Sequence, residues 1–418
     1  MQYKVIVIGG GPAGMMAAIE ASKNGHKVTL LEKMRTTGRK LSITGKGRGN
    51  LTNNIDISEF IKNVPGNGKF LYSAFNRFTN RDLIAYFNSL GVETKVERGE
   101  RVFPVSDTAM SFVNALKKEI NKYKVELKVN TCVSKICVTN DVDNVKKVTK
   151  VILESGEEIS CDKVILATGG KSYPMTGSDG TGYKIAQELG HKIVEPKGSL
   201  IPLETYEKYD LQGLSLKNVS INVLDGSKEV YNDFGEMLFT HFGVSGPIVL
   251  ISSAHILRIK NIDEKLKNKN IKMVIDLKPA LSYEKLSQRI QRDFEKFTKK
   301  QFKNSLSDLL PAKMIPEVIK ITKIDPSLQV DQITKEQRER IVKTLKEFTV
   351  TIKKFRPIDE AIITAGGVST KEINPQTMQS KLIDGLYFAG EIIDVDAYTG
   401  GFNLQIAFST GYVAGQLQ

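Results

Sequence analysis

Residues 3–32 restrict the possible folds of this chain more than any other stretch of the sequence. The run 5–8 is short, apolar and rich in β-branched residues, which is typical of a buried parallel strand. Gly9, Gly11 and Gly14 follow at the spacing G-x-G-x-x-G, and an alanine-rich helical segment and a second apolar run come next. This order of strand, glycine turn, helix and strand predicts the βαβ unit of a dinucleotide-binding fold.

Each glycine in this turn has a physical reason. Gly9 permits the tight turn, Gly11 lets the backbone approach a pyrophosphate, and Gly14 lets the helix pack closely on the sheet. Glu32 follows the second strand, eighteen residues beyond Gly14. An acid there favours a ribose with free hydroxyls, and hence FAD or NAD rather than NADP. The alternative is a glycine-rich turn in an unrelated α/β fold.

Composition narrows the class of protein. The chain has 418 residues, enough for two or three domains, and lacks a run of about eighteen apolar residues that would predict a membrane-spanning helix. The N-terminal run passes straight into the fold pattern, so we expect no signal peptide. Cys132, Cys137 and Cys161 form no C-x-x-C pair, and the four histidines are scattered, so no metal site is predicted. We expect a cytoplasmic protein.

The net charge of +13 admits two interpretations. It is compatible with RNA or an anionic membrane as partner. It is also what an AT-rich genome produces through abundant lysine, isoleucine and asparagine. The lysines are widely spread and no arginine-rich or aromatic-interleaved basic tract stands out, so we favour compositional bias and expect no nucleic-acid partner.

Later segments repeat the pattern of a buried strand that ends in small residues. The segments are 163–170, which ends in Ala167, Thr168, Gly169 and Gly170, then 361–368 and 385–391. Small residues let a backbone approach a dinucleotide closely. The polar, glycine-rich stretch 33–53 suits a pyrophosphate and the polar edge of a flavin, although a mobile surface loop would have the same composition.

Between 191 and 355 the sequence changes character. It contains no dinucleotide fingerprint, and residues 262–310 are lysine-rich and helical in pattern. We therefore expect residues 1–190 and 356–418 to form one domain, with 191–355 inserted as a second. In the first part, the stretch 125–137 alternates apolar and polar residues and predicts one strand.

Several motifs together resemble a known family, the bacterial FAD-dependent oxidoreductases that include aminoacetone oxidase and a 3-dehydro-bile acid reductase. The motifs are GGGPAG at 9–14, GRKLSITGKGRGNLTN at 38–53, ATGGKSYPMTGSDGTGY at 167–183, FTHFGVSGP at 239–247, TAGGVS at 364–369 and GLYFAGEIIDVDAYTGGFNLQIAFSTG at 385–411. Gly49 departs from the pattern, because many members carry cysteine there, so any role of that thiol cannot be transferred.

The resemblance implies an α/β protein, with a Rossmann-like FAD-binding domain and an inserted mixed α/β substrate or cap domain. It places the pyrophosphate on the first turn, the adenosine ribose at Glu32, and adenine against the backbone of Val133. Gly390, Glu391 and Asp394 would reach the ribityl chain and phosphates. The residues expected to bind FAD are Gly9, Gly11, Pro12, Ala13, Gly14, Glu32, Lys33, Arg39, Lys40, Asn50, Val133, Ala167, Thr168, Gly169, Gly390, Glu391, Asp394, Asn403 and Leu404.

The expected chemistry is hydride transfer between a small organic substrate and flavin N5, with NAD(P)H or O₂ as the other redox partner. Tyr398 and His241 are candidate catalytic residues because both are polar aromatics in glycine-flanked motifs, although the pattern favours a structural tyrosine and a satisfied core histidine. The sequence contains no second G-x-G-x-x-G motif, so it does not predict a dedicated NAD(P)H domain. A flavin-dependent RNA-modifying enzyme and a non-catalytic FAD-binding protein remain alternatives.

Overall fold

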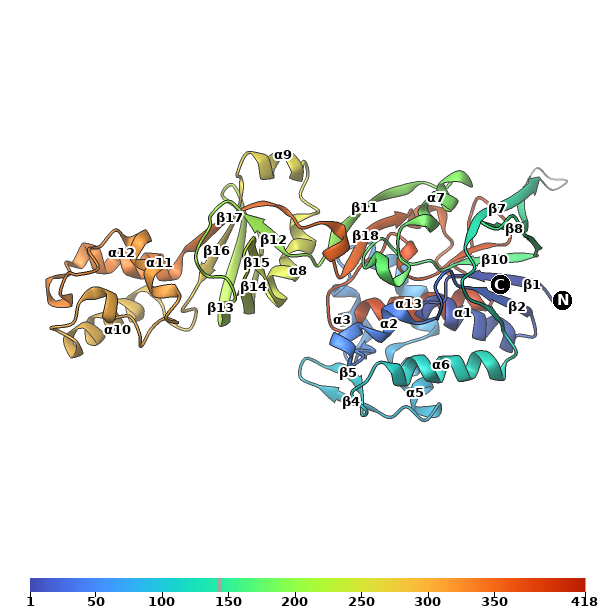
Figure 1. Ribbon diagram of the computed structural model, residues 1–418, viewed down its shortest axis with the longest axis horizontal. Coiled ribbons are helices and arrows are strands. Elements are labelled where there is room, and N and C mark those ends of the chain that lie inside the picture. The colour runs from blue at the N-terminus through green and yellow to red at the C-terminus, as the bar shows by residue number, and fades with distance from the viewer. Residues whose placement is uncertain (141–144, 418) are drawn as a thin grey trace. The chain divides into compact units, whose positions relative to one another are not determined.

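The computed structural model describes residues 1–140 and 145–417, which divide into two compact units (Figure 1). Unit 1 combines residues 1–199 with the segment from 357 onward, and unit 2 comprises residues 200–356. The first change of unit falls nine residues beyond the expected position of 190, because strand β11 (Ile193–Ser199) pairs with β18 (Ile363–Val368). The middle of the chain is therefore an insertion between two parts of unit 1.

Unit 1 is built on a five-stranded parallel sheet. Its strands, in spatial order, are β19 (Leu386–Phe388), β10 (Lys163–Leu166), β1 (Lys4–Ile8), β2 (Lys27–Leu31) and β6 (Glu126–Lys128). Strand β1 is buried from its second residue onward, as its continuous apolar run predicts. The strand–turn–helix–strand prediction for residues 3–32 is confirmed.

The helices of unit 1 cover this sheet or lie in the segments that connect its strands. They are α1 (Pro12–Lys23), α2 (Arg39–Ser42), α3 (Ile57–Lys62), α4 (Tyr72–Arg77), α5 (Asn80–Ser89), α6 (Met110–Lys122), α7 (Thr181–Glu188) and α13 (Phe402–Gly415). In Figure 1, α6 lies below the parallel sheet, α7 lies above it, and α13 lies beside α1. Helix α13 packs on α1 at very short range, since a Cβ atom at Gly411 would lie 2.4 Å from the carbonyl oxygen of Ala13.

Besides the antiparallel pair of β11 and β18, unit 1 contains two three-stranded antiparallel sheets. One is β3 (Thr52–Asn53), β5 (Arg101–Pro104) and β4 (Thr94–Glu97), and the other is β7 (Val133–Asn140), β8 (Lys146–Leu153) and β9 (Glu158–Ser160). The single strand predicted over 125–137 was wrong, because the chain leaves the parallel sheet after β6 and joins a different one at β7. Asn130 between them has a left-handed φ of 51°, and the N–H of Thr131 donates to the carbonyl of Glu32.

Unit 2 is a closed six-stranded barrel with helices. The barrel order is β12 (Leu203–Thr205), β15 (Gly243–Ser245), β14 (Lys228–Phe239), β13 (Ser215–Asp225), β16 (Ile271–Asp276) and β17 (Phe348–Phe355). The helices are α8 (Pro247–Ile256), α9 (Ile262–Lys267), α10 (Tyr283–Lys296), α11 (Met314–Thr322) and α12 (Lys335–Lys346). The helical prediction for 262–310 was wrong over 271–276, where alternate residues of β16 are buried in the barrel.

The described residues contain neither a membrane-spanning helix nor a cluster of metal-ligating side chains. Within residues 1–140 and 145–417, no helix is both long enough and apolar enough to span a bilayer. Over the same ranges, no three histidine, cysteine, aspartate or glutamate side chains gather as a metal site.

Candidate functional site

The turn between β1 and α1, residues 9–14, is the first part of the site, and we call it the glycine cradle. Gly9 has a φ of 106°, and a Cβ atom there would lie 2.4 Å from the carbonyl oxygen of Ala167. A Cβ at Gly14 would lie 1.8 Å from the carbonyl oxygen of Gly9. A Cβ at Gly11 would meet no protein atom within 4 Å. Packing of the chain therefore demands the first and third glycines, whereas the second leaves space that a ligand can occupy.

Helix α1 points its open end at this space. Its N-cap residue is Gly11, which offers no side-chain cap, and Pro12 occupies the first helical position. The backbone N–H groups of the first turn are therefore uncapped by side chains, and the helix dipole adds partial positive charge. This arrangement suits the phosphates of a dinucleotide.

Glu32 closes the opposite side of the cradle. Its carboxylate accepts hydrogen bonds of 2.7 Å from the backbone N–H groups of Gly10 and Met34. Burial raises the pKa of Glu32, and the two N–H bonds oppose that rise. Next to it, Lys33 pairs with Asp179 at 2.7 Å. Burial opposes ionisation of Asp179, but bonds from Lys33 and Thr181 outweigh it and lower the pKa of Asp179 to about 2.

These elements surround a cavity of about 210 Å³ within unit 1. Most of the predicted cofactor-binding residues line it: Gly9, Gly11, Pro12, Ala13, Glu32, Lys33, Arg39, Lys40, Val133, Ala167, Thr168, Gly169, Gly390, Glu391, Asn403 and Leu404. Lining residues that the sequence did not single out include Thr36, Thr131, Cys132, Ser178, Ile362 and Ile363. The lining thus combines segments from both ends of the chain.

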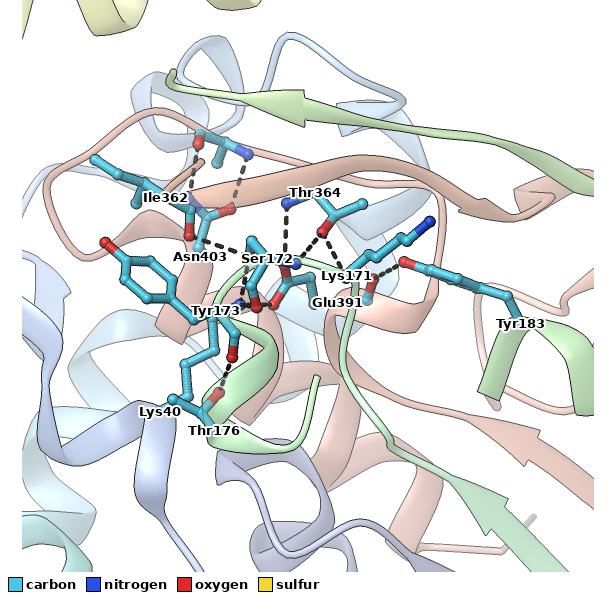
Figure 2. Close-up of polar contacts among 11 residues, drawn as sticks. Lys40, Lys171, Ser172, Tyr173, Thr176, Tyr183, Ile362, Thr364, Glu391 and Asn403 are labelled. Atoms are coloured by element: carbon cyan, nitrogen blue, oxygen red, sulfur yellow. Dashed lines mark hydrogen bonds and ion pairs between the residues drawn. The ribbon is translucent and has the colours of Figure 1, made fainter. Parts of the chain in front are cut away.

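Four side chains from separate segments meet beside the cavity, and we call Lys40, Ser172, Thr364 and Glu391 the polar node (Figure 2). The Lys40 ammonium lies 2.7 Å from Oε2 of Glu391 and donates to Oγ of Ser172 at 2.7 Å. Oε1 of Glu391 accepts from Oγ of Ser172 at 3.1 Å and from the N–H of Thr364 at 3.0 Å. The hydroxyl of Thr364 accepts from the N–H groups of Lys171 and Ser172.

The polar node fixes a cation at the cavity wall. The Lys40 and Glu391 side chains are 21% and 13% exposed, so their attraction is only partly screened by solvent. Sequence reasoning selected these two residues but missed Ser172 and Thr364. Ser172 and Thr364 lie in or next to segments that the sequence predicted to be glycine-rich or to end a strand. The sequence did not predict that these segments contact each other.

Other expected site residues lie outside the lining. Gly14 serves helix packing, as described above. The Asn50 amide, oriented to satisfy its neighbours, donates to the carbonyl of Thr52 and accepts from the N–H of Gly401. Asp394 accepts from the Asn67 amide through its carboxylate at 2.9 Å and its carbonyl at 2.8 Å.

The two candidate catalytic residues belong to different units. Tyr398, in unit 1, is half-buried, and its backbone N–H donates to the carbonyl of Asn63. His241, in unit 2, is exposed between β14 and β15, and its ring meets the edge of Phe242 with centroids 4.9 Å apart. Neither residue lines the cavity of unit 1. Their catalytic roles stay predictions.

Comparison with known proteins adds independent findings. The family model described as the HI0933-like protein Rossmann domain matches residues 3–417. The chain is 32% identical to the 3-dehydro-bile acid delta(4,6)-reductase of Clostridium scindens over 419 residues, covering 99% of this chain and 98% of that protein. It is also 32% identical to the ribosomal RNA dihydrouridine synthase of Haemophilus influenzae, covering 97% of this chain and 96% of that protein.

Solved structures resemble the whole chain in fold. The 3-ketosteroid delta1-dehydrogenase from Sterolibacterium denitrificans aligns with a TM-score of 0.54 at 12% identity, covering 99% of both chains. At that identity the likeness concerns the fold alone, and it agrees with the Rossmann-type sheet and second domain described above. The cradle, the cavity and the full-length family match lead to one conclusion: the chain belongs to the HI0933-like Rossmann-domain family and is an FAD-dependent oxidoreductase.

Proposed function

We propose that this protein reduces a carbon–carbon double bond conjugated to a carbonyl group, with NAD(P)H as the electron source and FAD as the carrier. One observation carries the proposal. Two relatives that match nearly the full chain have names describing different substrates but the same reacting group. A 3-dehydro-bile acid with delta(4,6) unsaturation has its double bonds conjugated to the 3-carbonyl, and uridine becomes dihydrouridine by reduction of a double bond conjugated to a ring carbonyl.

The residues of the cavity fit FAD. The space at Gly11 and the uncapped end of α1 would receive the pyrophosphate. The carboxylate of Glu32 would hold the adenosine ribose while it also accepts its hydrogen bond from the backbone. Asn403 and Leu404, at the start of α13, line the same cavity and would lie beside the flavin ring. Bound FAD would supply two-electron hydride chemistry at N5, which no side chain of the protein provides.

The chain's own side chains would position the substrate and polarise its reacting group. Lys40 is held at the cavity wall by Glu391 and Ser172, so its positive charge is fixed before any substrate arrives. A charge fixed in advance stabilises developing negative charge without reorganisation at the moment of reaction. Apolar lining residues such as Leu41, Ile362 and Ile363 limit access of water to the cavity.

A small organic enone is the leading substrate class, and a uracil base in ribosomal RNA is the second candidate. The distribution of positive charge over the two units supports the RNA substrate as this second candidate. Unit 2 carries 28 lysines and arginines against 20 acidic residues in 157 positions, whereas unit 1 carries 32 against 27 in 261 positions. The excess positive charge is therefore concentrated in unit 2, and a phosphate backbone is attracted to such a surface in a salt-dependent way.

Anaerobic spectroscopy tests the proposal. We expect purified protein to show flavin absorbance that NADH or NADPH bleaches, and that returns on mixing with a conjugated ketone or with unmodified ribosomal RNA. Mass spectrometry should then find two hydrogen atoms added to the acceptor. Return of absorbance only with RNA, weakening at high salt, would select the second candidate. Return with O₂ alone would indicate an oxidase, and no return with any acceptor would indicate a non-catalytic flavoprotein.

A further inference from the structure

Tyr173, which follows Ser172 in the loop after β10, has an unusual backbone conformation. Its φ of 53° and ψ of 58° place a bulky side chain in the left-handed region, which such residues rarely adopt. The conformation is held from both sides. The N–H of Ser172 donates to the hydroxyl of Thr364, and the carbonyl of Tyr173 accepts from the N–H and the hydroxyl of Thr176 at 2.8 Å. A strained residue that its neighbours hold in place is a candidate functional residue.

The side chain of Tyr173 lies against the polar node but takes no part in its hydrogen bonds. The Lys40 ammonium is 5.9 Å from the centre of the tyrosine ring. Figure 2 shows the ring beside Lys40 and Ser172, with its hydroxyl directed away from their contacts. Among residues 1–140 and 145–417, no group forms a hydrogen bond with this hydroxyl, and the residue is 38% exposed. The loop thus presents a donor that is available to a ligand.

We infer that Tyr173 contacts the substrate and donates a hydrogen bond to the carbonyl oxygen of its conjugated double bond. The inference rests on the proposed function. In the reaction, the β-carbon gains a hydride whose two electrons come from NAD(P)H. The π pair of the double bond then moves so that negative charge develops on the carbonyl oxygen, and the α-carbon takes a proton from water. Tyr173 stabilises the charge on oxygen, and Lys40, fixed by Glu391, is a positioning residue that adds a positive field.

Y173F tests this role because it removes only the hydroxyl. Y72F is the matched control, since Tyr72, on α4, is also an exposed tyrosine of unit 1 outside the cavity lining, but it has no ring contact with Lys40 of the kind that Tyr173 makes. We expect both variants to bind FAD and to be reduced by NAD(P)H at the wild-type rate. In Y173F, reoxidation of the reduced flavin by the acceptor should slow about 10²- to 10³-fold, as when one oxyanion donor is lost. The control should not change.

A binding measurement separates substrate contact from a structural role. Titration of the oxidised enzyme with the saturated ketone product perturbs flavin absorbance, and Y173F should bind it up to about tenfold more weakly. Wild-type rates and affinity in Y173F would overturn the inference while leaving the proposed function intact. Loss of FAD from Y173F would also overturn it, by showing a structural role. If neither acceptor reoxidises the reduced wild type, the proposed function fails and this inference fails with it.

Discussion

The glycine cradle and the polar node border one cavity, but they are built by different means. The cradle uses backbone alone, within six consecutive residues: packing demands Gly9 and Gly14, whereas Gly11 leaves space for a ligand. The node uses side chains, and its ion pair joins residues 351 positions apart. A backbone site depends on local spacing and can be recognised in the sequence. A side-chain site depends on the tertiary fold, and its members can be identified individually without revealing that they meet.

The largest expected effect tests the division of labour within the cradle. Gly14→Ala should destabilise the protein by more than about 3 kcal/mol, because its methyl group would overlap the carbonyl oxygen of Gly9 and that backbone cannot yield cheaply. Gly11→Ala should change the stability of the apoprotein by less than about 1 kcal/mol, yet weaken FAD binding about tenfold or more, because its methyl group fills ligand space. Urea unfolding of apoprotein and fluorescence titration with FAD measure the two quantities.

The two variants are controls for each other. If Gly11→Ala bound FAD like the wild type, the cradle would not be the pyrophosphate site. If Gly14→Ala folded normally but lost FAD, its role would be contact with the cofactor rather than helix packing.

The polar node should give an intermediate effect. We expect a double-mutant cycle of Lys40→Met and Glu391→Gln to show a coupling free energy of about 1–3 kcal/mol in urea unfolding, since both side chains are largely shielded from water. The control cycle uses Lys62 and Glu59, an exposed ion pair with side chains 69% and 57% exposed, where about 0–0.5 kcal/mol is expected. Equal coupling in both cycles would mean that the node is no more than a surface ion pair.

A third cluster extends the comparison to pH and should show the smallest effect. Oγ of Ser380 accepts from the N–H groups of Leu382 and Ile383, so its proton goes to Nε2 of buried His191, whose Nδ1 then donates to Glu372. Burial lowers the pKa of His191 below 6.5, although Glu372 opposes the shift. The unfolded state therefore takes up the proton more readily, and the free energy of unfolding should decrease as pH falls through about 6.5.

Urea unfolding at several pH values measures this dependence. His191→Gln should flatten the decrease, whereas His241→Gln, at an exposed position of unit 2, should leave the profile unchanged. A profile that keeps its slope in His191→Gln would assign the pH dependence to other groups.

The part of the fold that follows local rules was predictable. The glycine spacing and the apolar runs gave β1, α1 and β2, because hydrophobic periodicity and turn chemistry act over a few residues. The prediction of one strand over 125–137 was wrong because alternation indicates a strand but not the sheet that the strand joins. Residues 271–276 misled because neighbouring lysine-rich helices obscured the alternation of β16. In the site, Lys40 and Glu391 were named separately, but Ser172, Thr364 and Tyr173 gain meaning only from contacts that no local pattern encodes.

The packing of α13 on α1 also orders events during synthesis. A ribosome makes α1 near the start, yet the helix that covers it is residues 402–415, and β19 of the same sheet also comes after the whole of unit 2. Unit 2 can thus complete its barrel while unit 1 still lacks strands β18 and β19, helix α13 and the Glu391 half of its ion pair. The apolar face of α1 therefore stays uncovered in the nascent chain for most of translation. The flavin cavity is complete only after the last segment of the chain has been made.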